Sequence, residues 1–257
     1  GQEYISDFPN ALRFRKIRRG KTVLIEPEGI ALNAGGAPVQ PLGETDPQGG
    51  TSWGFHRSAI WRYDGSRRNH IVIGTDTGNL RLVIDTGDYF TTGNCRLTDD
   101  LRDNRGEVIK VHNRAAVAAF DLDGDGREDL IVGGQTYQRG LETDPSPGSG
   151  FRAWLNRGVD AEGLPILEET ELVIEGHVFP TGTNGHMHLA AADIDGDGEI
   201  EVILCAQQEG FKGRIMKKIP GRCGLHYTGN DLDGFSIHDA LMDIDGDGEL
   251  EMVFGGG

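Results

Sequence analysis

The chain contains the stretch Asp121-Leu-Asp-Gly-Asp-Gly-Arg-Glu-Asp129, and the pattern returns without gaps as Asp193-Ile-Asp-Gly-Asp-Gly-Glu-Ile-Glu201 and Asp243-Ile-Asp-Gly-Asp-Gly-Glu-Leu-Glu251. Each copy carries acids at its positions 1, 3, 5 and 9 and glycines at positions 4 and 6. An apolar run typical of a strand follows each copy: Leu130-Ile-Val, Val202-Ile-Leu and Met252-Val-Phe. The chain is therefore built from repeats in which an acidic loop leads into a strand.

The spacing of the acids predicts a calcium site in each loop. Ca²⁺ takes six to eight oxygen ligands, and a tightly turned loop can point carboxylates inward from every second residue. The glycines permit the positive φ that such a loop needs. Position 7 would contribute its backbone carbonyl, so its side chain is free to vary. The expected ligands are the carboxylates of Asp121, Asp123, Asp125, Asp129, Asp193, Asp195, Asp197, Glu201, Asp243, Asp245, Asp247 and Glu251, with the carbonyls of Arg127, Glu199 and Glu249.

Two other interpretations of the loops are weaker. An EF-hand begins in the same way but requires a bidentate Glu at position 12 and flanking helices. Position 12 is Val132, Leu204 and Phe254, and the flanking segments resemble strands. Simple acidic turns would explain one copy, but they do not explain three copies in register. We therefore expect three structural Ca²⁺ ions.

Composition excludes several classes of protein. The 257 residues include 41 Asp and Glu against 25 Lys and Arg, a net charge of −16, which does not suit binding to nucleic acid. Three Ca²⁺ ions would cancel six of these charges. No apolar run approaches the roughly 20 residues of a membrane span. The 40 glycines and short β-branched runs indicate a turn-rich all-β protein.

The repeats resemble the FG-GAP and VCBS repeats of β-propellers, the family that includes the integrin α-subunit head. The resemblance covers residues 51–257 and rests on the acidic loops and on Phe151-Arg-Ala-Trp-Leu-Asn-Arg-Gly-Val-Asp160 with Leu164-Pro-Ile-Leu-Glu168. It implies a propeller of four-stranded blades, each with Ca²⁺ in the hairpin between its first two strands. Because such propellers have seven or eight blades, we expect an incomplete ring.

The expected repeats span residues 51–110, 111–180, 181–230 and an incomplete 231–257. The first is degenerate, since Trp61 and Tyr63 stand where the first two Asp would be, and we expect it to bind no Ca²⁺. Residues 1–50 form a separate segment of short strands and a Gly/Pro-rich loop. This segment could instead close a small ring.

Histidines recur in register with the loops. The position five residues before each loop holds His56, Ala116, His188 and His238, and a small residue follows two positions later. Alternate residues of a strand share a face, so these histidines would surround the mouth of a central channel. They could be polar residues that bond a neighbouring blade, an acid–base or anion-binding site, or a transition-metal site.

Two functions follow from the resemblance. The first is an eliminative polysaccharide lyase acting on uronates, with His188 and His238 as base or charge neutraliser, His56 in support, Tyr227 as proton donor and Arg222 as carboxylate clamp. The second is a non-catalytic module that binds carbohydrate or an extracellular protein. Trp53, Trp61 and Trp154 could stack on sugars or belong to the core.

The expected location is extracellular or periplasmic, where Ca²⁺ is abundant enough to fill loops of modest affinity. Three cysteines allow one disulfide at most, and spacing favours a bond between Cys205 and Cys223, with Cys95 left over.

Overall fold

The computed structural model describes residues 55–75, 77–87, 93–111, 113–135, 151–176, 187–206 and 212–233, together with short strands at residues 13–14, 17–18, 24–25, 30–31, 33–34, 37–38, 240–242 and 251–253. These parts of the chain form strands and turns and no helix. The prediction of an all-β protein is confirmed. No helix among the described residues has the length and hydropathy needed to cross a membrane.

Most strands belong to three sheets. The first sheet contains β5 (Asn33–Ala34), β6 (Ala37–Pro38), β7 (Phe55–Trp61), β8 (His70–Thr75), β9 (Leu80–Asp85) and β10 (Asn94–Leu97). The second contains β11 (Asn113–Phe120), β12 (Asp129–Gln135), β13 (Phe151–Val159) and β14 (Pro165–Thr170). The third contains β15 (Val173–Glu175), β16 (Met187–Ala192), β17 (Glu201–Ala206), β18 (Gly213–Lys218) and β19 (Gly224–Leu232).

Each of these sheets has the same core of four antiparallel strands in chain order, namely β7 to β10, β11 to β14 and β16 to β19. The expected four-stranded repeat is thus confirmed. Three two-stranded pairs complete the described strands: β1 (Arg13–Phe14) with β4 (Ile30–Ala31), β2 (Ile17–Arg18) with β3 (Leu24–Ile25), and β20 (Ala240–Met242) with β21 (Glu251–Val253).

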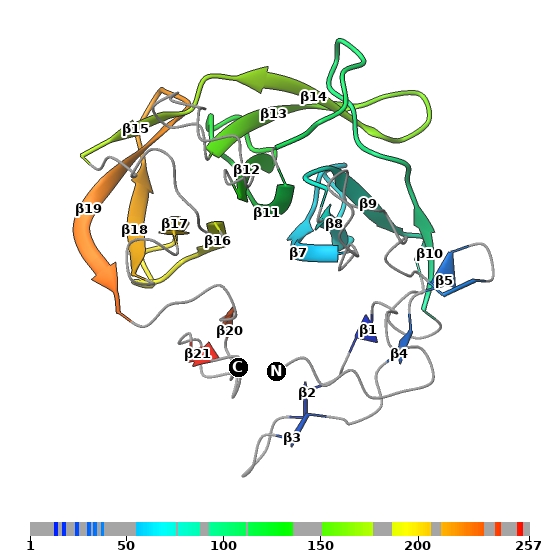
Figure 1. Ribbon diagram of the computed structural model, residues 1–257, viewed down its shortest axis with the longest axis horizontal. Coiled ribbons are helices and arrows are strands. Elements are labelled where there is room, and N and C mark those ends of the chain that lie inside the picture. Colours follow the sequence, from blue (N-terminus) through cyan, green and yellow to red (C-terminus); the bar gives the residue numbers. More distant parts are fainter. Residues whose placement is uncertain are drawn as a thin grey trace, which may run out of the picture.

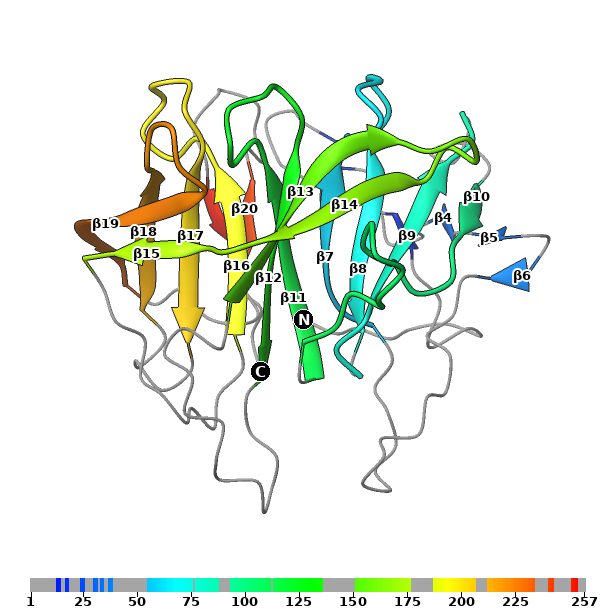
Figure 2. The ribbon, with the colours of Figure 1, turned by 90° about the horizontal axis from the view of Figure 1, so that it is seen from above.

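The three sheets lie side by side along an arc, with the first strand of each on the inner side (Figure 1). Strand β11 contacts both β7 and β16, and β16 contacts β20. The hairpin loops that follow these inner strands, residues 62–69, 121–128 and 193–200, project on one side of the molecule, the upper side in Figure 2. The repeat therefore places equivalent loops next to one another.

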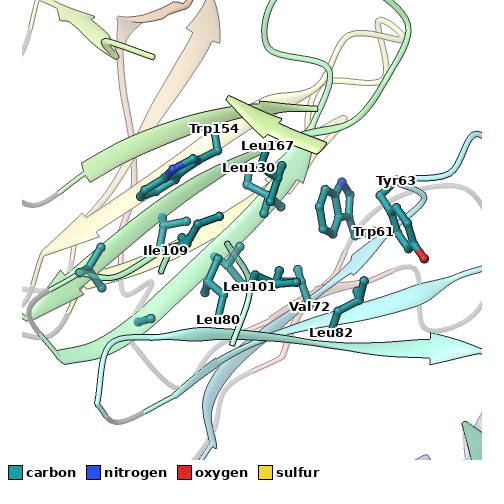
Figure 3. Packing of buried hydrophobic residues seen from close by; sticks show 14 of the residues in the cluster. Trp61, Tyr63, Val72, Leu80, Leu82, Leu101, Ile109, Leu130, Trp154 and Leu167 are labelled. Atoms are coloured by element: carbon teal, nitrogen blue, oxygen red, sulfur yellow. The ribbon is translucent and has the colours of Figure 1, made fainter. Parts of the chain in front are cut away.

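Hydrophobic faces join the sheets in series. Trp61, Val72 and Leu82 of the first sheet pack against Val117 and Trp154 of the second (Figure 3). The opposite face of the second sheet, including Phe120 and Leu155, packs against Leu204 and Met216 of the third. Because both faces of the second sheet are buried, its strands are apolar at consecutive positions instead of alternating with polar residues.

Small residues line the inner strands, as expected for crowded contacts. In β11, Ala115 and Val117 belong to the core shared with the first sheet, whereas Ala116 and Ala118 belong to the core shared with the third. A Cβ atom built on Gly74 of β8 would lie 2.0 Å from the carbonyl oxygen of Ala115. The backbones of the first two sheets therefore meet at a point that only glycine permits.

Segments that precede a sheet also take part in it. Strand β5 pairs in parallel with β10, so part of the expected 1–50 segment joins the first sheet. Strand β15, which lies within the expected 111–180 repeat, pairs in parallel with β19 of the third sheet. The first and third sheets therefore each contain a strand from the segment that precedes their four-stranded core in the chain.

Cys205 and Cys223, the pair that the spacing favours, are not joined by a disulfide, and Cys95 is in none either. Cys205 clusters with Ile203 on one face of the third sheet. Cys223 packs against the core on the other side of that sheet, which it shares with the second sheet. The sheet itself separates the two thiols.

Candidate metal centre

Aspartate side chains shape the loop between β11 and β12. Asp121 accepts hydrogen bonds from the backbone N–H groups of Gly124 and Gly126 at 2.7 and 3.0 Å. Asp123 and Asp125 each accept one from the residue two positions later. Gly124 and Gly126 have φ values of +84° and +87°, in the region that favours glycine. The repeated Asp and Gly positions thus set the path of the backbone.

The loop between β16 and β17 follows the same course. Asp193 accepts hydrogen bonds from Gly196 and Gly198, and Asp195 and Asp197 each accept one from the residue two positions later. Gly196 and Gly198 again have positive φ values, +75° and +89°. Two copies of the sequence pattern therefore produce one loop conformation.

The alternating acids converge in both loops. Carboxylate oxygens of Asp121, Asp123 and Asp129 lie within 4.8 Å of one another, as do those of Asp193, Asp195 and Asp197. Such clusters of hard oxygen donors are suited to a divalent cation of the Ca²⁺ type. Each cluster contains three of the four acids that the sequence predicts as ligands, and Asp125 and Glu201 are not part of them.

Asp129 is the most deeply buried acid of the first cluster, with 1% of its surface exposed. It accepts hydrogen bonds from the backbone N–H groups of Leu122, Asp123 and Asn156. Burial nevertheless outweighs these bonds and raises the pKa of Asp129 to about 6. A cation beside it would offset this cost of burying a charge. The donor set and the buried carboxylate together fit Ca²⁺.

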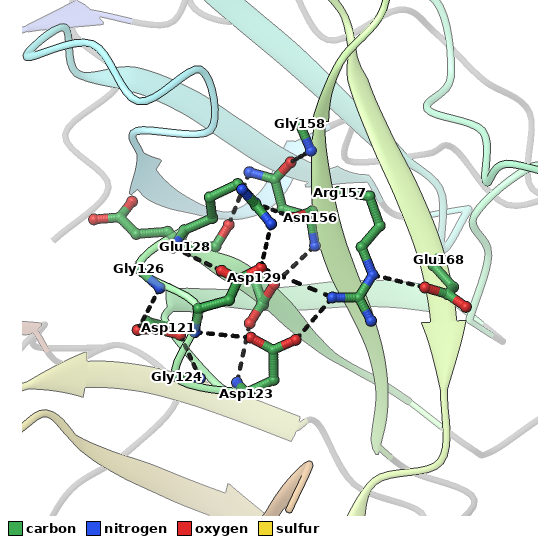
Figure 4. A network of polar contacts seen from close by, with 12 residues as sticks. Asp121, Asp123, Gly124, Gly126, Glu128, Asp129, Asn156, Arg157, Gly158 and Glu168 are labelled. Carbon is green, nitrogen blue, oxygen red and sulfur yellow. Dashed lines mark hydrogen bonds and ion pairs between the residues drawn. The ribbon is translucent and has the colours of Figure 1, made fainter. Parts of the chain in front are cut away.

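Arginines border the first cluster (Figure 4). Arg157 lies 2.8 Å from Asp123 and is shared with Glu168 at 2.7 Å. The side chain of Arg127 bonds Asp125 and the backbone carbonyl of Asn156. These cations touch the outer acids of the loop, while Asp121 and Asp129 are held by backbone N–H groups.

Glu201 occupies the place of Asp129 in the second loop and is equally buried, at 1% exposed. Its Oε2 accepts a hydrogen bond from Ile194, as Asp129 does from Leu122. The Lys217 ammonium lies 3.0 Å from Glu201 Oε1, 2.9 Å from Asp195 and 2.7 Å from Asp197. A protein cation thus stands among three of the predicted ligands.

The third loop lies largely outside the described residues, which leaves Asp243, Asp245, Asp247 and Glu249 undescribed. Glu251 begins β21 and pairs with Met242. Asp129 pairs with Phe120, and Glu201 with Ala192, in the same register. The backbone of the third hairpin therefore matches the other two at this point.

The degenerate loop of the first sheet is shifted by one residue from its expected alignment. Trp61 pairs with His70 as Phe120 pairs with Asp129, so His70 and not Asn69 stands at the ninth position of the loop. Asp64 then takes the place of Asp123. His70 Nε2 lies 3.3 Å from Asp64, and His70 Nδ1 accepts a hydrogen bond from the Asp85 backbone N–H. An imidazole therefore occupies a position held by an acid in the other loops.

The same shift changes the histidine register. Arg57, and not His56, pairs with Gly74 at the position equivalent to Ala116 and His188, and His56 lies at a bulge. His188 is buried on β16, opposite Cys205. His238 lies outside the described residues. The expected set of histidines on one face therefore loses His56, because a bulge is not visible in the residue spacing.

Tyr227 and Arg222 lie away from His188. Tyr227 is on β19, three strands from β16, which corresponds to about 14 Å at roughly 4.8 Å per strand. Its hydroxyl donates a 2.7 Å hydrogen bond to Asp231, which raises the pKa of Tyr227 above its usual value. Arg222 lies in the turn before β19, paired with Glu175 on the surface. The structure does not gather these three residues into one site.

A groove of about 670 Å³, which the sequence analysis missed, lies between the segment that follows β9 and the β13–β14 hairpin. Leu101, Leu164 and Ile166 form apolar parts of its wall. Its charged residues are Arg96, Arg102, Asp99, Asp100, Asp103 and Asp160. The groove brings together residues about 60 positions apart, so no local motif could have indicated it.

A scan against models of known protein families finds no match to the chain, and a search of curated proteins finds none either.

Proposed function

We propose that this chain is a Ca²⁺-stabilised array of β-propeller blades of the FG-GAP and VCBS kind, which serves outside the cytoplasm as a binding module. The observation that carries the proposal is the convergence of carboxylates in two equivalent hairpin loops. Its support includes the serial packing of four-stranded sheets, with the first strand of each on the inner side of the arc.

Ca²⁺ would be held by the acids of each loop and by the carbonyl at position 7, and it would supply positive charge to buried carboxylates. The 121–129 loop and the residues around it also join neighbouring sheets. Trp61 Nε1 donates to the Glu128 carbonyl at 2.8 Å, and Asn156 Nδ2 donates to the Tyr63 carbonyl at 2.7 Å. Lys218 of the third sheet donates to the Asp121 carbonyl at 3.1 Å. A cation that orders a loop would therefore order the joint beside it.

A binding module fits the geometry better than a lyase built on the predicted residues. Elimination needs a base, a proton donor and a carboxylate clamp around one sugar. Tyr227 on β19 and Arg222 in the turn before it lie three strands from β16, the inner strand on which His188 is buried. These groups could not act on one substrate without a rearrangement of the sheet.

The groove is the candidate ligand surface. Arg96 and Arg102 donate to backbone carbonyls, so their charges remain available to a ligand. Trp61 and Trp154 belong to the hydrophobic core, which removes them as platforms for sugar stacking. The mixture of apolar and charged groups suits a segment of an extracellular protein better than a polysaccharide.

Calcium titration by calorimetry tests the metal part of the proposal. Asp123→Asn should remove one binding event, because Asp123 belongs to the first carboxylate cluster. Asp64→Asn is the matched control, since Asp64 and Asp123 each accept a hydrogen bond from the backbone N–H two residues later. The control should leave the number of Ca²⁺ ions unchanged. Absence of Ca²⁺ binding by the unmodified protein would refute the assignment.

Incubation with uronate polysaccharides distinguishes the binding module from the lyase. An eliminative lyase generates an unsaturated product that absorbs in the ultraviolet, and we expect no such product. A rising absorbance that His188→Ala abolishes, in a variant that still binds Ca²⁺, would overturn the binding module and restore the lyase.

A further inference from the structure

We propose that Lys217 is a built-in competitor for the cation of the 193–201 loop, so that this loop binds Ca²⁺ more weakly than the 121–129 loop. The proposal rests on the proposed function, because it concerns the same metal loops. It predicts two alternative occupants of one acidic cluster, an ammonium of the chain and a Ca²⁺ ion from solution.

Lys217 lies among the acids of the second loop. Its ammonium lies 3.0 Å or less from carboxylates of Asp195, Asp197 and Glu201, all predicted ligands. The ammonium donates hydrogen bonds to Asp195 and Asp197 and forms an ion pair with the buried Glu201. A cation ligated by Asp195 and Asp197 must therefore displace it.

The Lys217 side chain can move its ammonium out of the loop into solvent. Its side chain is 28% exposed, and a lysine has four flexible methylene groups and a strongly hydrated head. Departure of the ammonium into water would leave the backbone of β18 in place. The exchange of a lysine for Ca²⁺ therefore needs no change in the sheet.

The second sheet has no lysine at the position equivalent to Lys217. Strand pairing makes Leu155 the equivalent of Lys217, since Trp154 pairs with Leu130 as Met216 pairs with Val202. Leu155 is buried in the core between the second and third sheets. The nearest equivalent cation, Arg157, is shared with Glu168 and touches the outer acid Asp123. Lys218 does approach the first loop, but the hydrogen bond of its ammonium goes to the backbone carbonyl of Asp121 and not to a carboxylate.

The two loops should therefore behave differently in the metal-free protein. In the second loop, Lys217 neutralises part of the repulsion among the acids and maintains the loop. In the first loop, the buried Asp129 has no lysine in this role. Binding of Ca²⁺ to the second loop must displace an ammonium that contacts three expected ligands, including the buried Glu201. The arginines beside the first loop contact its outer acids, Asp123 and Asp125, and leave the buried Asp129 to the cation. Ca²⁺ should thus fill the first loop at lower concentration.

Lys217→Met tests the proposal, because methionine keeps most of the stem and removes the charge. Calorimetric titration with Ca²⁺ alone should show one binding event strengthened at least about tenfold. That event is assigned to the second loop by its loss in Asp195→Asn. Lys212→Met is the matched control, since Lys212 pairs with the exposed Asp233 and lies outside the loop. The control should leave every Ca²⁺ affinity unchanged.

Thermal melting supplies a second readout, because the effect of Lys217→Met on the melting temperature should differ between chelator and saturating Ca²⁺. Lys217→Met should melt below the unmodified protein in chelator, where the acids lose their only described ammonium. In saturating Ca²⁺ it should melt at the same temperature or above. A lysine with a merely structural role would lower the melting temperature under both conditions, and that result would overturn the proposal.

The titration also separates the two proposals. If the unmodified protein and Lys217→Met both fail to bind Ca²⁺, the proposed function fails. If both bind Ca²⁺ with equal affinity at the second loop, the function stands and the role of Lys217 is refuted.

Discussion

Asn156 links two hairpin loops through a single buried amide. Its Nδ2 donates to the carbonyls of Tyr63 and Glu128, at 2.7 and 3.2 Å, and its Oδ1 accepts from Gly158 at 3.0 Å. The residue is 0% exposed. It therefore holds the first sheet to the 121–129 loop of the second.

We predict that Asn156→Ala lowers the free energy of unfolding by about 3 kcal/mol, because buried carbonyls lose their donor. Urea denaturation monitored by tryptophan fluorescence measures this loss. Asn104→Ala is the control, since Asn104 is exposed, and it should change stability by less than about 0.5 kcal/mol. Equal stabilities of the two variants would show that the amide does not hold the joint.

The ion pairs of Glu169, which lies outside the acidic loops, predict a pH dependence of stability. Burial by itself would raise its pKa, but hydrogen bonds from Arg152 and Arg105 outweigh burial and lower the pKa below its usual value. A carboxyl whose pKa is lowered by folding stabilises the protein above its ordinary pKa. That stabilisation is lost as the pH falls through the folded pKa.

We therefore expect Glu169→Gln to lower stability at neutral pH by about 1 kcal/mol and to flatten the fall in stability on acidification. Chemical denaturation at several pH values in the acid range measures both effects. Glu175→Gln is the comparison, because Glu175 pairs with Arg222 on the surface. If stability falls equally on acidification in Glu169→Gln and in the unmodified protein, the ion pairs of Glu169 with Arg152 and Arg105 do not cause that fall.

The outer edges of the sheets share a feature that the repeats alone did not indicate. Strand β5 runs parallel to β10, Asp103 forms a parallel bridge to Leu167 of β14, and β15 runs parallel to β19. In each case the segment that precedes a sheet covers its last strand. Covering an edge strand in this way blocks pairing with other chains.

The contact between the inner strands of the first two sheets gives a prediction about packing. A Cβ on Gly74 would lie 2.0 Å from the oxygen and 2.7 Å from the carbon of the Ala115 carbonyl, both backbone atoms. Gly74→Ala must push the two sheets apart, and we expect a loss of about 3 kcal/mol or a failure to fold. The measurement is urea denaturation of the soluble protein, with Ser58→Ala on the exposed side of β7 as control. A Gly74→Ala variant as stable as the control would contradict the close packing.

The loops and strands were predictable because their determinants are local. Asp121 and Gly124 act on backbone groups within five residues, so the pattern of the loop carries its own conformation. The apolar runs after each loop likewise became β12 and β17. The register of the degenerate loop was not predictable, because the aromatic residues Trp61 and Tyr63 occupy core positions, which the sequence alone placed at metal positions.

Contacts between side chains of different strands were also beyond prediction. Lys217 meets the acids of its loop through the pairing of β17 with β18, and Lys218 reaches the neighbouring sheet. The distance between Tyr227 and His188 depends on the order of four strands. Spacing along the chain could not show which of these residues meet.

The molecule as a whole combines serial packing of sheets with a large negative charge. The chain carries a net charge of −16, and one of the two acidic clusters lies in the 121–129 loop, which contacts both neighbouring sheets. Repulsion within such clusters opposes folding when no cation is bound. Calcium binding and the stability of the sheet array should therefore be coupled.

Thermal unfolding in the presence and absence of Ca²⁺ tests this coupling most directly. Ca²⁺ at about 100 times its dissociation constant contributes about 2.7 kcal/mol for one site, which corresponds to a rise of about 5 to 10 °C in melting temperature. The rise should increase with Ca²⁺ concentration and shrink in Asp123→Asn but not in Asp64→Asn. An identical melting temperature in saturating Ca²⁺ and in chelator would contradict the assignment of the loops as structural calcium sites.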